Sequence, residues 1–433
     1  MNMKRFLVGM LPLLMIVTLI GCGGKSSSAS GTAPAVASDK VLTVEELGNH
    51  ELYTHLDDNA LSGVTKPILA SRAGIKKALP VTQKKNVVVG WSEPTMSSAW
   101  FAGIQKGAVQ YTREYGYELK FLVATDFDAN KQSNDIEALI TQGIDVLVLD
   151  AVDFQAQIVD VQKAVDAGIP VISLYAFQDE VPVVTTVTAN YYEQTFLAGE
   201  NAAKLFTDPI EAVMIPGQVG HPLSNSRIAA FLSGWIYAKQ QTAGTAKPYR
   251  QDAQLEGYNG YLSLVRNGRL DLTGAYGINV VGMANGGFND VGGMAAAEDL
   301  LTAHPNIKLI FPDNDQEAAG AIKVLDQRGL TGQIKVATGC DGDTSALALV
   351  GEGKLVSTGY NNPLAISKAI VELIHKIFEE AYDANDMPMI TALPVSLFTR
   401  DNYMSVFDSN TEYGKILDVE FRTTDEVNAG VSR

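Results

Sequence analysis

Residues 307–341 carry the pattern that most restricts the fold of this chain. Two short apolar runs, 307–311 and 334–337, have the length and composition of buried strands. The segment between them, 316–327, has the periodicity of an amphipathic helix. A strand, a helix and a second strand in this order form a crossover unit whose two strands run parallel. The pattern therefore predicts an α/β fold built on a parallel sheet.

Polar residues follow both of these strands. Asp313, Asn314 and Asp315 come after the first strand, and Asp341 and Asp343 come after the second. The carboxyl ends of the strands in an open parallel sheet border the ligand crevice, so we expect these side chains to hold a small polar molecule. The alternative is turn and helix-cap chemistry, which Asp and Asn supply in many loops.

The same alternation of strands and helices runs from residue 86 onward in two series. In the first series we expect strands at 86–91, 117–124, 145–150, 171–175 and 183–187, with helices at 99–115, 131–142, 154–167 and 191–206. In the second we expect further strands at 212–216, 278–283 and 355–360, with helices at 223–241, 290–303 and 344–350. Residues 242–277 exceed the usual connection length and are expected to be a surface elaboration with one helix near 258–265. The series predict two doubly wound parallel sheets.

The start of the chain has the features of a bacterial export signal. Lys4 and Arg5 precede an apolar run over 6–20, which predicts a signal peptide over 1–21. The sequence Leu-Ile-Gly-Cys that ends at Cys22 resembles a lipobox, which would make Cys22 the lipidated residue. An ordinary secretory signal followed by an incidental cysteine is the alternative. Residues 22–39 are then a flexible tether, and 40–85 an N-terminal extension of unreadable function.

Composition and motifs argue against several classes of protein. The formal net charge of −16 argues against nucleic-acid binding. Residues 126–137 have part of a calcium-loop spacing, but Lys131 stands where the loop needs Gly, and the five His are too scattered to hold a metal. No nucleophile–base motif or phosphate loop is present, so we expect neither a cofactor nor an enzyme. Cys340 ends an apolar strand and is expected to be a buried small hydrophobe.

Several short motifs follow one another in a fixed order between residue 86 and about residue 402. They are Trp100-Phe101 with Gly107-Ala108, Gln142-Gly143-Ile144-Asp145, the run 167–172, His304-Pro305-Asn306-Ile307, Asn314-Asp315 with Ala319-Gly320-Ala321, Gly339, Asp341-Gly342, and Asn361-Asn362-Pro363. With these motifs the chain resembles the type I periplasmic binding proteins that deliver simple sugars to ABC importers, the ribose- and galactose-binding group.

The resemblance implies a two-lobed clamp with a three-strand hinge and a ligand bound between the lobes. The first lobe would comprise 86–189 and 363–393, and the second 190–362 and 394–433. The chain would cross between lobes near 188–190, 359–362 and 393–394. The implied partner is an ABC permease in the inner membrane. The protein itself would be a monomeric receptor, anchored by a lipid in the periplasm or at the outer face of the cell membrane. A sensory receptor for chemotaxis or a sensor kinase is the alternative.

The resemblance also carries over a set of ligand-binding residues. They are Ser98, Trp100, Phe101, Asp153, Tyr175, Arg227, Phe288, Asn314, Asp341 and Asn361. Aromatic rings stack on sugar faces, while carboxylate and amide groups bind hydroxyls. Trp100 and Phe101 could instead belong to the core of their helix, and Asp153 could be a loop cap.

Two departures from the family pattern leave the ligand open. Tyr175-Ala176 stand where the ribose-type pattern has an acid followed by Arg. Phe231 stands where the second lobe's Arg is expected, and Arg227 lies one helical turn earlier. Without the acid and Arg pair the first lobe loses charge-assisted bonds to hydroxyls. We therefore expect a small polyhydroxylated ligand, a sugar or sugar-like molecule, whose identity need not be ribose.

Overall fold

The computed structural model describes residues 83–175, 183–245, 250–380 and 390–417. The signal peptide, Cys22, the tether and nearly all of the N-terminal extension lie outside these ranges, as does Ala176. Within them, no helix is both long and apolar enough to cross a membrane.

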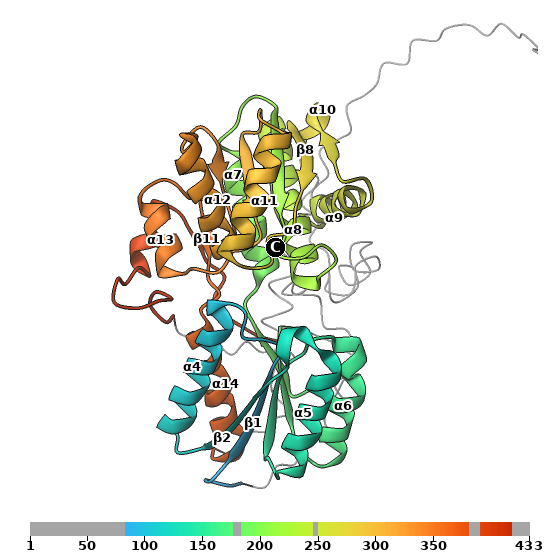
Figure 1. The fold of residues 1–433 in the computed structure, drawn as a ribbon, viewed down its shortest axis with the longest axis vertical. Coiled ribbons are helices and arrows are strands. Elements are labelled where there is room, and N and C mark those ends of the chain that lie inside the picture. The colour runs from blue at the N-terminus through green and yellow to red at the C-terminus, as the bar shows by residue number, and fades with distance from the viewer. Residues whose placement is uncertain (1–82, 176–182, 246–249, 381–389, 418–433) are drawn as a thin grey trace, which may run out of the picture. The chain divides into compact units, whose positions relative to one another are not determined.

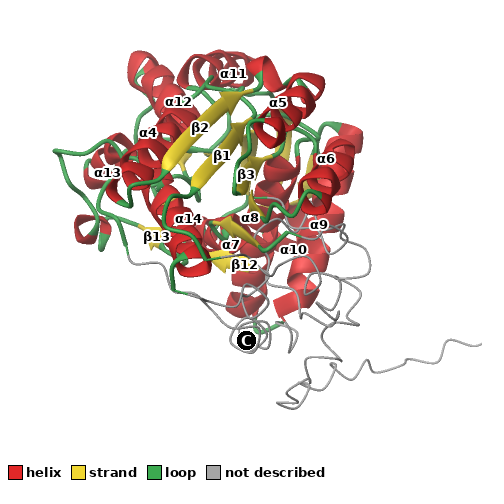
Figure 2. Ribbon diagram, turned by 90° about the horizontal axis from the view of Figure 1, so that it is seen from below, coloured by secondary structure: helices red, strands yellow, loops and turns green. Residues whose placement is uncertain are grey.

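The first sheet has six strands that all run parallel, in the order β12-β5-β4-β3-β1-β2. Its strands are β1 (Val88–Glu93), β2 (Glu118–Val123), β3 (Val146–Asp150), β4 (Val171–Leu174), β5 (Thr185–Thr188) and β12 (Ile390–Ala392). Figure 2 shows β2, β1 and β3 side by side. Strand β12 follows all strands of the second sheet along the chain, so the first sheet combines segments from both ends of the described residues.

Helices cover both faces of the first sheet. They are α4 (Ala99–Glu114), α5 (Ala129–Thr141), α6 (Phe154–Asp166) and α14 (Pro363–Phe378). Helices α4 and α14 lie on one side, and α5 and α6 on the other (Figure 1). Strand β3 shows why, because Val146 and Val148 join one core cluster while Leu147 and Leu149 join the other. Helices α4 and α14 approach closely, since a Cβ on Gly107 would lie 2.6 Å from the Ser367 side chain.

The second sheet has five strands in the order β10-β9-β6-β8-β7. They are β6 (Ile210–Ile215), β7 (Leu270–Leu272), β8 (Ile278–Met283), β9 (Leu309–Pro312) and β10 (Lys335–Val336). All neighbours are parallel except β7, which pairs antiparallel with β8 at the edge. The helices are α7 (Tyr191–Ala203), α8 (Pro222–Ala243), α9 (Arg250–Asn267), the short α10 (Thr273–Tyr276), α11 (Asp290–Ala303), α12 (Asp315–Arg328) and α13 (Thr344–Gly351). Two doubly wound sheets in succession confirm the predicted fold class.

The expectation that 242–277 is a surface elaboration is wrong. Helix α9 is much longer than expected, and strand β7 was not anticipated. Tyr261, Leu264 and Leu270 are buried in the same core cluster as strands β6 and β8. Gly257 lets α9 lie against α8, because a Cβ there would come within 2.5 Å of the Ser233 backbone nitrogen. Small residues on the contact face weaken the apolar periodicity by which a core helix is recognised.

The strand expected at 355–360 is also wrong in its extent and its partner. Only β11 (Thr358–Gly359) is a strand, and it pairs antiparallel with β13 (Leu397–Phe398), outside the five-stranded sheet. At Tyr360, the residue after β11, the side chain of Gln194 forms the backbone hydrogen bonds that a neighbouring strand would otherwise form. Its Nε2 donates to the Tyr360 carbonyl at 2.8 Å, and its Oε1 accepts from the Tyr360 amide at 2.9 Å. The chain therefore leaves the sheet pattern here and passes into α14.

The chain passes between the two sheets at three places. It leaves the first sheet after β5 and enters α7 at Tyr191, and it returns between β11 and α14. It passes over a third time between β12 and β13. These three passages form the hinge of the two-lobed fold.

Candidate ligand-binding site

A cavity of about 290 Å³ lies where the carboxyl ends of strands from both sheets meet. This volume is close to the lower end of the range for small-molecule pockets, roughly 300–1,000 Å³. All ten residues expected at the site line this one cavity. They are Ser98, Trp100, Phe101, Asp153, Tyr175, Arg227, Phe288, Asn314, Asp341 and Asn361. Their ligand contacts remain predictions, but their convergence is a property of the fold.

Aromatic rings form the wall on the side of the first sheet. The ring centroid of Trp100 lies 5.1 Å from that of Tyr175 and 5.2 Å from that of Phe101. The Phe101 ring in turn lies 6.3 Å from Phe127. Trp100 also packs in the core cluster, and its Nε1 donates to the carbonyl of Asn361 at 2.9 Å. Trp100 therefore belongs both to the core and to the cavity wall, and it connects α4 to the passage before α14.

The backbone is strained at three positions around the cavity, two on the side of the first sheet and one on the side of the second. Among the described residues, the non-glycine residues with positive φ are Phe127 (59°), Tyr175 (64°) and Phe288 (57°). All three line the cavity. Such conformations cost on the order of 1–3 kcal/mol each and gather at ligand sites, where the surrounding structure enforces them. Phe127 ends the short 3₁₀ helix after β2, and Tyr175 and Phe288 lie in the loops that follow β4 and β8.

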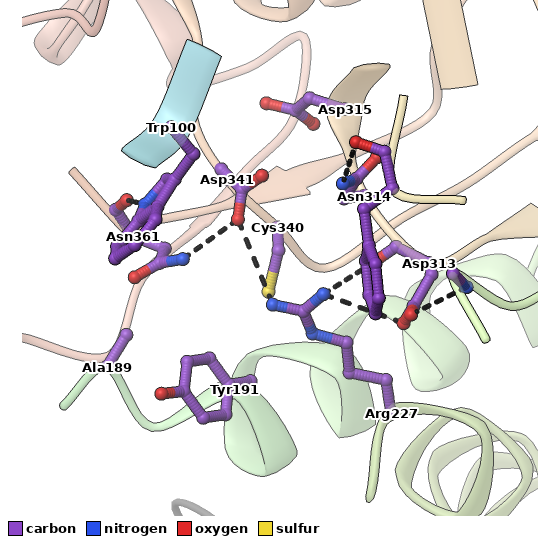
Figure 3. Close-up of polar contacts among 12 residues, drawn as sticks. Trp100, Ala189, Tyr191, Arg227, Asp313, Asn314, Asp315, Cys340, Asp341 and Asn361 are labelled. Atoms are coloured by element: carbon purple, nitrogen blue, oxygen red, sulfur yellow. Dashed lines mark hydrogen bonds and ion pairs between the residues drawn. The ribbon is translucent and has the colours of Figure 1, made fainter. Parts of the chain in front are cut away.

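A buried charged cluster forms the floor on the side of the second sheet (Figure 3). The Arg227 Nη1 atom lies 3.6 Å from Asp313 Oδ1, and its Nη2 atom lies 3.8 Å from Asp341 Oδ1. The guanidinium also lies 5.2 Å from the centre of the Tyr191 ring. Arg227 thus reaches the cavity from one turn before the position that the family pattern indicated, because α8 turns this face toward the two carboxylates.

Asp341 and Asn361 form a hydrogen-bonded pair at the same floor. The Asn361 Nδ2 atom donates to Asp341 Oδ1 at 2.9 Å. The Asn361 Oδ1 atom is buried and has no hydrogen-bond partner among the described residues, so it can accept from a ligand. Burial raises the pKa of Asp341, while Arg227 and Asn361 act in the opposite direction. The pair therefore offers a ligand both a carboxylate and an amide oxygen.

The remaining expected residues combine capping with a position at the cavity. Asn314 caps α12, since its Oδ1 accepts from the Glu317 amide at 3.0 Å, while its Nδ2 donates to the Phe288 carbonyl at 3.4 Å. Asp153 caps α6 by accepting from the Ala156 amide at 3.1 Å. The cap alternative is therefore real for both residues. Ser98 stands before α4 without a side-chain capping bond.

Sequence reasoning missed several residues of the cavity. Asp150 ends β3, and a polar residue at the end of an apolar strand is the signal that identified Asn314 and Asp341. Phe127 lies in the segment 126–137, whose spacing resembles only part of a calcium loop and gives no indication of an aromatic wall. His221 faces the Phe288 ring with centroids 5.4 Å apart, and nothing in its sequence context pointed to the site.

Other expected features can be placed against this geometry. Cys340 is fully buried and burial raises the pKa of its thiol, which confirms a buried small side chain. Within the described ranges, no group of three or more His, Cys, Asp or Glu is arranged to hold a metal ion.

Comparison with known proteins shows the family to which this chain belongs. Residues 89–381 match the family described as the periplasmic binding protein domain. The ribose import binding protein of Bacillus subtilis is 26% identical over 304 residues, which cover 69% of this chain and 82% of that protein. The D-ribose/D-allose-binding protein of Pseudomonas aeruginosa is 23% identical over 316 residues, which cover 70% of this chain and 86% of that protein.

Solved structures share the fold. An ABC transporter solute binding protein from Mycobacterium smegmatis with bound glycerol has a TM-score of 0.58 and 22% identity, covering 76% of this chain and 99% of its own. The arabinose-binding component from Shewanella sp. ANA-3 has a TM-score of 0.58 and 17% identity, covering 74% and 94%. Members of the matched family bind substrates and are not enzymes, and they work in the periplasm or cell envelope. The chain belongs to the periplasmic binding protein family, in its type I ribose- and galactose-binding group.

Proposed function

We propose that this protein is the lipid-anchored substrate-binding component of an ABC importer and captures one small polyhydroxylated ligand, a sugar or sugar-like molecule, in the cavity between its lobes. The observation that supports this most directly is the composition of the cavity wall. Aromatic rings from the first sheet face a buried set of Arg227, Asp341 and Asn361 from the second. Rings for the apolar faces of a molecule, opposite donors and acceptors for its hydroxyls, are what a polyol requires.

Each lobe has its own part in the proposed capture. The first lobe comprises 86–189 and 363–393 and supplies the rings of Trp100 and Phe101. The second lobe comprises 190–362 and 394–433 and supplies the hydroxyl-binding groups. A ligand that contacts both lobes binds the closed form more tightly than the open form, so it shifts the equilibrium toward closure by hinge rotation. The permease then distinguishes loaded from empty receptor.

The relatives support import of a sugar rather than another solute. Two of the relatives are named for ribose import and for ribose and allose binding. Because sequence identity with them is 26% or lower, the choice of sugar does not transfer with the fold. The aromatic Tyr175 in place of the family's acid argues for a different ligand.

The proposed anchor is a lipid on Cys22 after removal of 1–21, with 22–39 as the tether. The receptor is then a monomer held at the envelope near its permease. Labelling cells with radioactive palmitate tests this. The wild-type chain should incorporate label and Cys22→Ser should not. Label in both, or in neither, would contradict the anchor while leaving ligand binding unaffected.

Isothermal titration calorimetry of the purified full-length protein tests ligand capture. Pentoses, hexoses and cyclitols are titrated one at a time, and we expect one of them to bind with a stoichiometry of one. Arg227→Gln should weaken that binding, because the variant lacks the charged guanidinium that donates hydrogen bonds to the hydroxyls of the ligand. Arg266→Gln, on the exposed surface of α9, is the matched control and should bind as the wild type does.

Uptake separates import from sensing. Cells that lack the gene should lose uptake of the radiolabelled ligand found by calorimetry, and the wild-type gene should restore it. Tight binding with undiminished uptake would favour the sensory alternative. Absence of binding by any member of the panel would refute a sugar-binding function.

A further inference from the structure

Two buried carboxyl groups lie side by side at the cavity, and the proposed sugar contacts do not use them. Glu93 ends β1 and Asp150 ends β3, and the two strands are neighbours in the first sheet. The exposed fraction is 0% for Glu93 and 6% for Asp150. Asp150 lines the cavity, and Glu93 lies behind it. A buried carboxyl pair of this kind is costly to keep unless something compensates its charge.

The surrounding protein supplies little compensation. The Glu93 Oε1 atom accepts from the Trp91 indole at 2.6 Å, and the Glu93 and Asp150 side chains share a hydrogen bond, which requires that one of the two carboxyls is protonated. The permanently charged base at this cavity, Arg227, is directed to Asp313 and Asp341 instead. Burial raises the pKa of Glu93, and burial raises the pKa of Asp150 to about 8. The pair therefore holds protons that a cation in the cavity could replace.

The second basic residue of the cavity does not change this balance. Burial lowers the pKa of His221, so the imidazole is neutral at pH 7. Asp150, Asp153 and Asp341 all line the cavity, against one guanidinium. The ligand space consequently carries more acidic than basic groups, with the excess on the side of the first sheet.

The aromatic wall stands next to the acid pair. Tyr175 directly follows β4, whose Leu174 is the register partner of Asp150. The Tyr175 ring is close enough to both acids that they contribute to raising the pKa of its hydroxyl, after burial and Tyr191. The centroid of the Trp100 ring lies 5.1 Å from the centroid of the Tyr175 ring. The faces of Trp and Tyr rings attract ammonium groups, most strongly where water is excluded.

From this arrangement we infer that the ligand carries a protonated amine, held between the Asp150 carboxylate and the rings of Tyr175 and Trp100. The ligand class is an amino sugar or an amino cyclitol, whose hydroxyls reach Arg227, Asp341 and Asn361. The inference rests on the proposed function, because it assigns the ligand class of the same cavity. Asn361 Oδ1 supplies a further acceptor on the opposite side.

Binding of the amine has a proton balance that can be measured. The ammonium group keeps its proton and forms an ion pair with the carboxylate, while the pair Glu93 and Asp150 releases a proton to the solvent. Two tyrosines also lie close enough to interact electrostatically with the pair: Tyr175 after β4 with both acids, and Tyr191 on α7 with Asp150. The two tyrosine hydroxyls stay protonated because burial raises the pKa of each.

Matched ligand pairs provide the test. Calorimetry of the full-length protein at pH 7 compares D-glucose with D-glucosamine, D-galactose with D-galactosamine, and myo-inositol with an amino-deoxyinositol. We expect the amine to bind at least about tenfold more tightly than its neutral partner in at least one pair, which corresponds to about 1.4 kcal/mol. Repeating that titration in buffers of different ionisation enthalpy should reveal release of a proton, whereas the neutral partner should release none.

Variants identify the group responsible. Asp150→Asn should reduce the preference for the amine to within about twofold, and Glu93→Gln should reduce proton release. Asp166→Asn is the matched control, because it removes one carboxylate from the exposed far end of α6. Neutral sugars that bind as tightly as their amines, or a preference that survives in Asp150→Asn, would overturn the inference and leave the sugar-binding function standing. Absence of binding by every compound would overturn both.

Discussion

Asp341→Asn separates the ligand-binding role of this carboxylate from any role in stability. The substitution keeps the shape of the side chain and removes its charge. In the free protein Asp341 Oδ1 carries the contacts with Asn361 at 2.9 Å and with Arg227 at 3.8 Å. An amide oxygen can take the place of Oδ1 toward Asn361. What the variant loses is a charged acceptor for the hydroxyls of the ligand.

The two consequences have different magnitudes. A hydrogen bond to a charged group contributes about 1.5–3 kcal/mol, so the dissociation constant should rise roughly 10- to 150-fold. Burial raises the pKa of Asp341 in the folded protein, so its charged form opposes folding at pH 7. Arg227 keeps Asp313 as its nearer counterion, at 3.6 Å. The free energy of unfolding should therefore stay within about 1 kcal/mol of the wild type, or increase.

Calorimetry with the bound sugar measures the first quantity, and urea unfolding followed by circular dichroism measures the second. Asp401→Asn, on the exposed surface, is the control for loss of a carboxylate. Unchanged affinity in Asp341→Asn would mean that the carboxylate does not touch the ligand. A loss of more than about 2 kcal/mol in stability would mean that its charge holds the fold, and the reasoning from burial would be wrong.

Three further predictions concern stability. Asp315→Ala should lower the free energy of unfolding by at least about 3 kcal/mol, because its carboxylate accepts from two backbone amides at 2.7 and 2.8 Å and from the Thr358 hydroxyl at 2.6 Å. Urea titration measures this loss, and a loss below about 1 kcal/mol would contradict the prediction. Gly234→Ala should cost about 1–3 kcal/mol in the same assay, because the new Cβ would lie 1.9 Å from the Phe196 carbonyl oxygen and force α7 and α8 apart; wild-type stability would refute the close packing. The melting temperature of the ligand-free protein should fall as pH rises between about 4 and 8, because the folded-state pKa of Asp150 lies above its unfolded value and its stabilising contribution is lost as the carboxyl ionises; Asp150→Asn should flatten this slope, and identical slopes would argue against it.

The fold was predictable because its signals are local. The apolar run and helical period over 307–341 gave β9, α12 and β10 within a few residues of their observed bounds. Glycines after helices, such as Gly143 and Gly168 with φ of 72° and 76°, mark where the strand that follows begins. These features act within one or two turns of chain, so a single sequence displays them.

The parts that could not be predicted depend on distant partners. Gln194 lies 166 residues from Tyr360, and nothing near either residue indicates that they bond. Helix α9 joins the core through Gly257 against Ser233, a fit that small residues give without an apolar period. The position of Arg227 follows from which face α8 turns to the carboxylates, which the family spacing could not fix.

The outline of the candidate site was predictable from two kinds of signal: polar residues after strands indicate Asn314 and Asp341, and the resemblance to the family indicates the full set of ten. All ten expected residues line the cavity, although the capping bonds of Asn314 and Asp153 show how one side chain can serve two purposes. Asp150 was not predicted, although it ends an apolar strand and carries the same kind of signal as Asn314 and Asp341, which follow strands. The family pattern indicates a site residue at Tyr175, after β4, and none at Asp150, at the end of β3.

The bonds of Gln194 have a mechanical consequence for the hinge. Gln194 lies in the first turn of α7, just after the first passage, and its side-chain amide bonds to both the amide and the carbonyl of Tyr360 in the second passage. Two connecting segments joined in this way cannot twist independently, so opening and closing should follow one common axis instead of a spread of directions. The Trp100 indole donates to the next carbonyl along the second passage, that of Asn361, so a residue that lines the cavity is connected to the hinge. If the proposed ligand contacts that ring, as we predict, its binding is coupled directly to the segment about which we expect the lobes to turn.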